Sequence, residues 1–175
     1  ISLLINMVEI DPNHEKSFAL LAACNQKVDD SALAVRSFKK VQEIRPHDAS
    51  NLVNLGMALA KQGDLISSME AYNKAIAIKP NYIEAHYNLG IALKGLDRLE
   101  EAELSYRQAI ALKPDYAKAH YNLANTLQEL GGSEKAGTRY MRAIVLKPNY
   151  AEAYCNLANT LQDLGKLEEA EASCK

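Results

Sequence analysis

Apolar and small side chains recur along this chain at a fixed period of 34 residues. The prolines mark that period, each at the same point of it: Pro12, Pro46, Pro80, Pro114 and Pro148. Self-similarity at a period of about 20–50 residues indicates an array of small structural repeats. With proline at position 32, the repeats are residues 15–48, 49–82, 83–116 and 117–150, with an earlier repeat's tail at 1–14 and a partial repeat at 151–175.

The apolar positions predict two packed helices in each repeat. Positions 4, 7, 8 and 11 share one face of a helix that turns about 100° per residue, which predicts an amphipathic helix A. Small residues at positions 8 and 20 allow helix B to approach it closely, and an aromatic ring at position 24 fills the space beside them. Position 8 is Ala22, Gly56, Gly90, Ala124 and Ala158; position 20 is Ala34, Ser68, Ala102, Ala136 and Ala170; position 24 is Phe38, Tyr72, Tyr106 and Tyr140.

Turn residues separate the predicted helices. Position 15, between helices A and B, is Asp29, Gly63, Asp97, Gly131 and Gly165. Proline at position 32 ends helix B and begins the link to the next repeat. The alternation of apolar and polar residues that is typical of strands does not occur. The sequence therefore predicts an all-α chain, residues 1–175, that forms a single array.

These residues resemble the tetratricopeptide repeat (TPR) family, which has small residues at positions 8 and 20, an aromatic residue at 24 and proline at 32. The resemblance covers the whole chain. It implies a right-handed superhelical solenoid of antiparallel helix pairs, in which one face of helix A lines a concave groove that holds partner peptides. Position 4 departs from the family pattern, where tryptophan is common: it is Phe18, Leu52, His86, His120 and Tyr154.

The face of helix A opposite the apolar stripe carries the candidate binding residues. After Leu20 in the first repeat, position 6 is Asn54, Asn88, Asn122 and Asn156, and position 9 adds Asn125 and Asn159. An asparagine amide has both a donor and an acceptor, the complement of a peptide unit. We expect this asparagine ladder to hold an extended peptide through its backbone. The alternative is that the asparagines bond the neighbouring repeat and tie the array together.

Aromatic and charged residues extend this face. Tyr87 and Tyr121, at position 5, are candidate contacts because tyrosine suits binding surfaces. The alternative is that they pack on their own helices. Lys61 and Lys94 lie toward the N-terminal repeats, with Lys16 and Lys27, whereas Glu129, Glu152 and Asp163 lie toward the C-terminal end. Such a charge gradient orients a polar peptide. The alternative is that these are solvated helix faces. Position 5 is nowhere basic, so the carboxylate clamp of chaperone-binding family members is not expected.

Composition and charge limit the classes of partner that we expect. The formal net charge of −2 gives no reason to expect nucleic acid or an anionic membrane. No apolar run approaches the roughly 18 residues of a membrane helix. The cysteines, Cys24, Cys155 and Cys174, have no metal-ligand spacing and are expected to be reduced thiols, which favours the cytoplasm. The chain begins with Ile1 rather than methionine, and we expect a fragment of a longer protein.

Two features suggest chemistry at first sight. The stretch GGSEKAGT, residues 131–138, resembles a phosphate-binding loop, but Thr138 stands where that motif needs lysine, and no strand precedes it. In the repeat register it is the A–B turn, with Ser133 expected to cap helix B. Gly137 inside that helix predicts a soft joint, with faster amide exchange than in helix B of repeat 83–116. His86 and His120 lie in register at position 4, where we expect packing rather than metal binding.

The sequence favours a non-catalytic module that binds a peptide or protein segment without a cofactor or a metal. Two alternatives remain. HYNLA and YCNLA look like the repeat region of O-GlcNAc transferases, so the chain could be the substrate-recognition region of a larger glycosyltransferase. Both chain ends fall inside helix B without a polar capping helix, which would favour end-to-end self-assembly into a scaffold.

Overall fold

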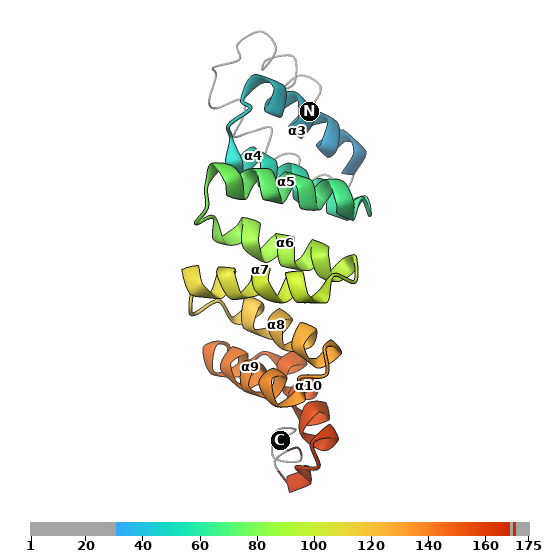
Figure 1. Cartoon of the computed structure of the whole chain (residues 1–175), viewed down its shortest axis with the longest axis vertical. Coiled ribbons are helices and arrows are strands. Elements are labelled where there is room, and N and C mark those ends of the chain that lie inside the picture. The colour runs from blue at the N-terminus through green and yellow to red at the C-terminus, as the bar shows by residue number, and fades with distance from the viewer. Residues whose placement is uncertain (1–30, 169, 171–175) are drawn as a thin grey trace. The chain divides into compact units, whose positions relative to one another are not determined.

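The structure is a computed structural model that describes residues 31–168 and 170, and these form helices joined by short turns (Figure 1). The helices are α3 (Ser31–Ile44), α4 (Ala49–Lys61), α5 (Leu65–Ile78), α6 (Ile83–Gly95), α7 (Leu99–Leu112), α8 (Ala117–Glu129), α9 (Ser133–Leu146) and α10 (Ala151–Asp163). No strand occurs in this part of the chain, which confirms the all-α prediction. The tail at 1–14, Cys24, Cys174 and the chain ends invoked for self-assembly lie outside the described residues.

The helices alternate between the two predicted types. The A helices are α4, α6, α8 and α10, and the B helices are α3, α5, α7 and α9. The chain divides into two compact parts, residues 1–88 and 89–175. In the first part α4 packs against α3 and α5; in the second, α8 packs against α7 and α9, and α9 packs against α10 (Figure 1). Successive helices therefore pair as the repeat predicts.

The predicted core register is confirmed at positions 8 and 24. A Cβ atom built on Gly56 would lie 2.5 Å from Cε1 of Tyr72, and one built on Gly90 would lie 2.6 Å from Cε1 of Tyr106. Both rings are almost fully buried. The tyrosine of helix B thus occupies the space that a side chain at position 8 of helix A would need, which is why the pattern requires a small residue there.

The turn between helices A and B has the same backbone in each described repeat. Position 15 has positive φ at Gly63 (86°), Asp97 (59°), Gly131 (79°) and Gly165 (74°). Glycine adopts this left-handed conformation without a steric cost, and aspartate is among the few other residues that tolerate it. The turn role predicted for this position is confirmed.

The links between repeats are β-turns around the periodic proline. The amide of Tyr82 donates to the carbonyl of Lys79 at 3.1 Å across Pro80, and the ammonium of Lys79 lies 4.6 Å from the centroid of the Tyr82 ring. The same turn and the same cation–π contact recur at Lys113–Tyr116 and Lys147–Tyr150. Proline at the second place of the turn presets its backbone angle, so the link is short and repeats closely.

The GGSEKAGT stretch follows a helix, α8, which removes the context of a phosphate-binding loop. Gly131 and Gly132 form the turn as predicted, but the predicted cap is wrong. Ser133 is the first residue of α9, and the N-cap is Gly132, which has no side chain to bond the free amides. Gly137 is buried inside α9, and a Cβ atom there would meet Leu157 and Thr160 only at 3.8 and 3.9 Å. Nothing in the packing therefore requires glycine at this position, and the soft joint stays a prediction.

Candidate functional site

The predicted ladder residues lie on successive A helices. Asn54 is on α4, Asn88 on α6, Asn122 on α8 and Asn156 on α10, and each is half-buried. Asn125 is also half-buried, whereas Asn159 is exposed. Tyr87 and Tyr121 are half-buried beside them. All these side chains therefore lie at the edge of the core, where an amide can reach both a neighbouring helix and solvent.

The structure brings three of the predicted residues together between α8 and α10. The Nδ2 group of Asn156 donates to the hydroxyl of Tyr121 at 3.1 Å and to Oδ1 of Asn125 at 3.0 Å. Asn156 belongs to the next repeat, so position 6 of one A helix bonds positions 5 and 9 of the preceding A helix. At this rung the ladder ties two repeats together, as the alternative interpretation of the asparagines requires.

Three residues that the sequence did not single out for the site complete this hydrogen-bond network. The hydroxyl of Tyr140 on α9 donates to Oδ1 of Asn125 at 2.6 Å and approaches Oε1 of Gln128 at 3.0 Å. Thr160 on α10 also contacts Oε1 of Gln128, at 3.3 Å. From the sequence, Tyr140 was predicted only to fill space between the helices. One feature of the sequence could have indicated this network. Asn125 is at position 9, where the two preceding repeats have the apolar residues Met57 and Ile91.

Burial sets the acidity of the Tyr140 phenol. Its side chain is fully buried, and this burial, with a smaller contribution from Tyr121, raises the pKa of Tyr140 from 10.0 to about 12. The phenol therefore holds its proton and acts as a hydrogen-bond donor throughout the physiological range.

Tyr121 is held from two sides. Its ring centroid lies 5.9 Å from that of Tyr140 and 4.8 Å from that of Tyr150, with both pairs tilted. Its hydroxyl accepts the bond from Asn156. Tyr121 therefore packs on α9 and on the following link rather than on its own helix, while part of its surface remains accessible.

One lysine and one glutamate of the predicted charge gradient form an ion pair with each other. The ammonium of Lys94 on α6 lies 2.8 Å from Oε1 of Glu129 on α8, and both side chains are partly exposed. Lys94 is thus engaged with one of the carboxylates assigned to the opposite end of the gradient. Lys61 is exposed in the last turn of α4.

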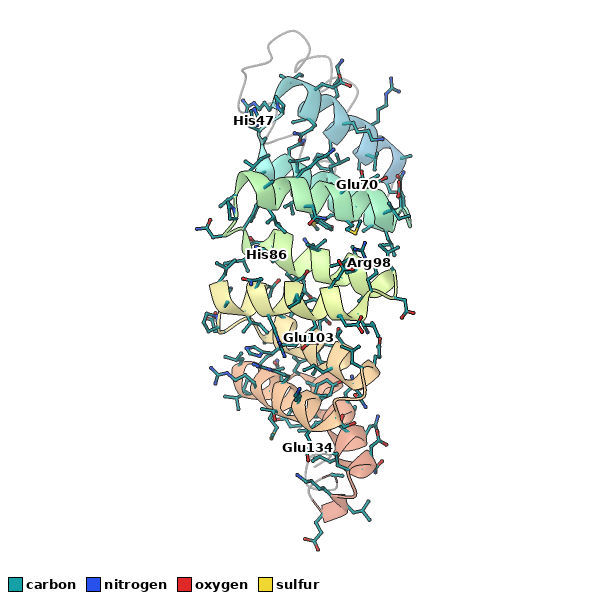
Figure 2. The ribbon with its side chains drawn as sticks, in the orientation of Figure 1. His47, Glu70, His86, Arg98, Glu103 and Glu134 are labelled. Atoms are coloured by element: carbon teal, nitrogen blue, oxygen red, sulfur yellow. The ribbon has the colours of Figure 1, made fainter. Side chains whose placement is uncertain are left out.

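The two histidines at position 4 are hydrogen-bonded to the preceding link. Nε2 of His86 lies 2.7 Å from the carbonyl oxygen of Pro80, and Nε2 of His120 lies 3.1 Å from that of Pro114 (His86 is labelled in Figure 2). His120 is buried, and its Nδ1 has no partner among the described residues. Position 4 therefore fixes helix A to the proline turn, a packing role.

Acid should weaken the fold through His120. Burial and the charges of Arg139 and Arg142 lower the pKa of His120 below 6.5, although the bond to Pro114 opposes them. A lowered folded-state pKa means that stability is present above pH 6.5 and is lost as the pH falls below it, because the unfolded chain binds the proton more tightly. We expect the unfolding free energy to fall more between pH 7 and pH 5 in the wild type than in His120→Leu, measured by urea denaturation. Equal pH dependence in the two proteins would contradict this role of His120.

The remaining features concern metals, membranes and thiols. Within residues 31–168 and 170, no group of three or more His, Cys, Asp or Glu side chains could hold a metal ion. No helix in the same residues is long and apolar enough to cross a membrane. Cys155 is exposed with a free thiol.

Models of repeat families match most of the chain. One, described as TPR repeat, matches residues 56–97 and 96–131. Two, described as Tetratricopeptide repeat, match residues 117–150 and 140–172. Together they span residues 56–172, and the match at 117–150 has the bounds of one predicted repeat. No curated protein matches the chain.

Solved structures agree with the family models. A crystal structure of MamA is 27% identical, with a TM-score of 0.83, and covers 87% of this chain and 90% of its own. MamA from Desulfovibrio magneticus RS-1 is 21% identical, with a TM-score of 0.83 over 90% of this chain and 89% of that one. YrrB, described as a TPR protein with an unusual peptide-binding site, is 17% identical, with a TM-score of 0.79 over 97% of this chain and 88% of that one. The last two likenesses concern the fold alone.

Proposed function

The chain belongs to the tetratricopeptide-repeat family, and from this premise we propose that it is a non-catalytic scaffold for protein interactions that binds an extended peptide along its A helices. The proposed contacts are Asn54, Asn88, Asn122, Asn156, Asn125, Asn159, Tyr87, Tyr121, Lys61 and Lys94. The partner is a protein or peptide segment. The proposal involves neither nucleic acid nor a membrane.

The observation that carries this proposal is that, among the described residues, the nitrogen of the Asn156 amide is hydrogen-bonded within the array and its oxygen is not. Its Nδ2 group bonds Tyr121 and Asn125, whereas its Oδ1 accepts no hydrogen bond from any residue that the structure describes. The bonds to the preceding repeat fix the amide plane and leave an acceptor at a half-buried edge. An acceptor of this kind suits an N–H group of an extended peptide backbone, largely regardless of its side chains. The structural and binding roles of the ladder thus coexist in one side chain.

Removal of two rungs tests the proposal. We expect Asn88→Ala with Asn122→Ala to weaken binding of a short labelled peptide rich in alanine and serine by about 1–3 kcal/mol, since two hydrogen bonds are lost. The same peptide with N-methylated amides at alternate residues should bind the wild type as weakly as the unmodified peptide binds the double variant. Fluorescence anisotropy gives both affinities.

The matched control removes two asparagines elsewhere. Asn73 on α5 and Asn149 in the last described link are exposed, and we expect Asn73→Ala with Asn149→Ala to bind like the wild type. Unchanged binding in the Asn88 and Asn122 variant, accompanied by a large loss of unfolding free energy, would leave the ladder with a structural role only. Equal affinity for the N-methylated peptide would also contradict backbone recognition.

A further inference from the structure

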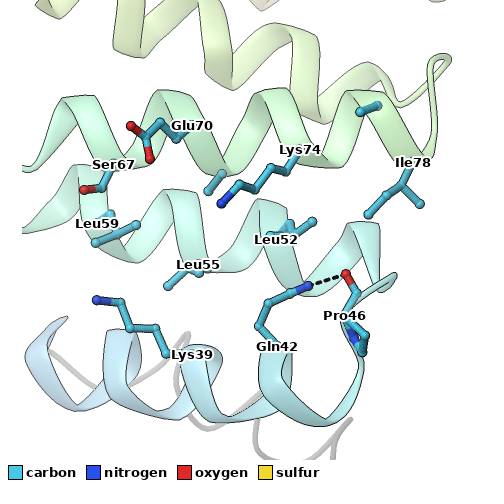
Figure 3. Close-up of a pocket in the computed structure, with 12 residues that line it drawn as sticks. Lys39, Gln42, Pro46, Leu52, Leu55, Leu59, Ser67, Glu70, Lys74 and Ile78 are labelled. Atoms are coloured by element: carbon cyan, nitrogen blue, oxygen red, sulfur yellow. Dashed lines mark hydrogen bonds between the residues drawn. The ribbon is translucent and has the colours of Figure 1, made fainter.

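A cavity of about 590 Å³ lies between α3, α4 and α5 (Figure 3). Its floor is apolar and consists of Leu52, Leu55 and Leu59 of α4. Lys39 of α3 and Lys74 of α5 line its two walls. Volumes of about 300–1,000 Å³ with an apolar lining and a few polar groups are usual for ligand-binding pockets. This cavity is separate from the asparagine ladder, whose residues do not line it.

Coordinated sequence differences occur among the residues that line the cavity. The next two repeats have histidine at position 4, bonded to the proline carbonyl, but here position 4 is Leu52, which cannot make that bond. Gln42 of α3 supplies it instead: its Nε2 donates to the carbonyl of Pro46 at 2.6 Å, and its Oε1 accepts from Asn51 at 2.8 Å.

The exchange involves a second position of the repeat. Position 28, occupied by Gln42 here, is isoleucine in the following repeats, as Ile76, Ile110 and Ile144. Gln42, which is hydrogen-bonded to the link and to Asn51, therefore stands where the other repeats have isoleucine. Leu52 stands where the next two repeats have histidine. Leu52, Leu55 and Leu59 are 2%, 8% and 5% exposed, so the floor is a buried apolar surface that a ligand would meet only inside the cavity.

Two lysines, partly offset by the carboxylates of Glu70 and Asp64, flank the leucine floor. Figure 3 shows the ammonium groups of Lys39 and Lys74 on either side of the leucines. Both lysines are exposed, and neither is ion-paired with a carboxylate among residues 31–168. Glu70 is the one acidic residue among the lining residues, so the lining carries an excess of one positive charge.

We propose that this cavity binds a short acidic, amphipathic segment of a partner protein, with a leucine-like side chain on the Leu52–Leu55–Leu59 floor and carboxylates against Lys39 and Lys74. The apolar side chain supplies most of the affinity, because burial removes its surface from water. The two lysines select acidic neighbours and reject basic ones.

Three labelled peptides that share one Gly-Ser-flanked scaffold test the proposal. Their central residues are Glu-Leu-Leu-Glu, Lys-Leu-Leu-Lys and Glu-Ser-Ser-Glu. We expect saturable binding of the first alone by fluorescence anisotropy. Lys39→Ala with Lys74→Ala should weaken it about tenfold, the scale of two partly exposed ion pairs. Ala77→Trp, which adds a ring at an exposed lining position, should weaken it without any change in charge.

The control variant removes the same charge elsewhere. Lys40→Ala with Lys118→Ala alters two lysines that do not line the cavity and should leave the affinity unchanged. Equal binding of Glu-Leu-Leu-Glu by the Lys39 and Lys74 variant, or of Glu-Ser-Ser-Glu by the wild type, would overturn the proposal. A concentration-dependent dimer that the Lys39 and Lys74 variant abolishes would assign the cavity to a second copy instead. Asn88→Ala with Asn122→Ala should not affect this binding, so failure of one site is distinguishable from failure of the other.

Discussion

Replacement of Gly90 with alanine is expected to lower the free energy of unfolding by about 1–3 kcal/mol, the usual cost of overpacking a core. The added methyl carbon would lie 2.6 Å from Cε1 and 2.8 Å from Cδ1 of Tyr106, distances at which one of the two groups must move. The Tyr106 ring is 1% exposed, so it has no open space to enter. The higher helix propensity of alanine, about 1 kcal/mol, offsets only part of this cost. Urea denaturation of the variant and the wild type measures the difference.

The same substitution in a different environment is the matched control. Gly137→Ala also replaces a buried helical glycine, but its methyl group would meet Leu157 and Thr160 at ordinary contact distances. At residue 137 the substitution improves helix propensity without a steric clash, and we expect the free energy of unfolding to rise by about 0.5–1 kcal/mol. A gain of stability in both variants would show that the Tyr106 ring yields easily and that position 8 does not require glycine.

Position 8 already has a methyl group in other repeats, as Ala22, Ala124 and Ala158. Ala124 occurs in the repeat where the hydroxyl of Tyr140 bonds Asn125 and Gln128. The ring of helix B is therefore anchored by side chains of helix A in this repeat. Ile91→Asn places an equivalent amide beside Tyr106, and it should recover part of the stability that Gly90→Ala loses.

The repeat register and the core could be predicted from the sequence because each depends on one position at a time. A glycine or aspartate at position 15 indicates a left-handed turn, and a small residue at position 8 indicates close helix packing, whatever surrounds them. The same reasoning did not place Ser133 correctly. Ser133 could cap α9 only if the helix began one residue later than residue 133. The conformation of the whole turn, and not the serine alone, determines where the helix begins.

The polar contacts could not be predicted because they depend on several positions in different helices. Tyr140 bonds Asn125, 15 residues away, and Asn156 bonds Tyr121, 35 residues away. Similarly, Gln42 and Leu52 belong to different repeats, yet both line one cavity, where Gln42 makes the bond that a histidine makes elsewhere. A position-by-position comparison treats each as a tolerated variation, and only their proximity in space makes them a site.

The removal of the Tyr140 hydroxyl should have opposite effects on stability at neutral and at alkaline pH. At pH 7, Tyr140→Phe loses the donor to Asn125 and Gln128. Oδ1 of Asn125 keeps the bond from Asn156, and Gln128 is only half-buried, so the expected loss is that of one hydrogen bond, about 1 kcal/mol.

Alkaline pH reverses the order of the two proteins because the pKa of Tyr140 in the folded chain is raised to about 12. Below pH 10 the phenol is protonated in both folded and unfolded wild type, so it adds no pH dependence. Between pH 10 and pH 12 the unfolded chain loses the proton first, and the wild type loses up to about 1.4 kcal/mol per pH unit that Tyr140→Phe does not lose. The two unfolding free energies should therefore cross near pH 11, since lysine titration is common to both proteins. Parallel curves above pH 10 would contradict the raised pKa of the buried phenol, whereas a crossing would show that the folded chain resists its ionisation.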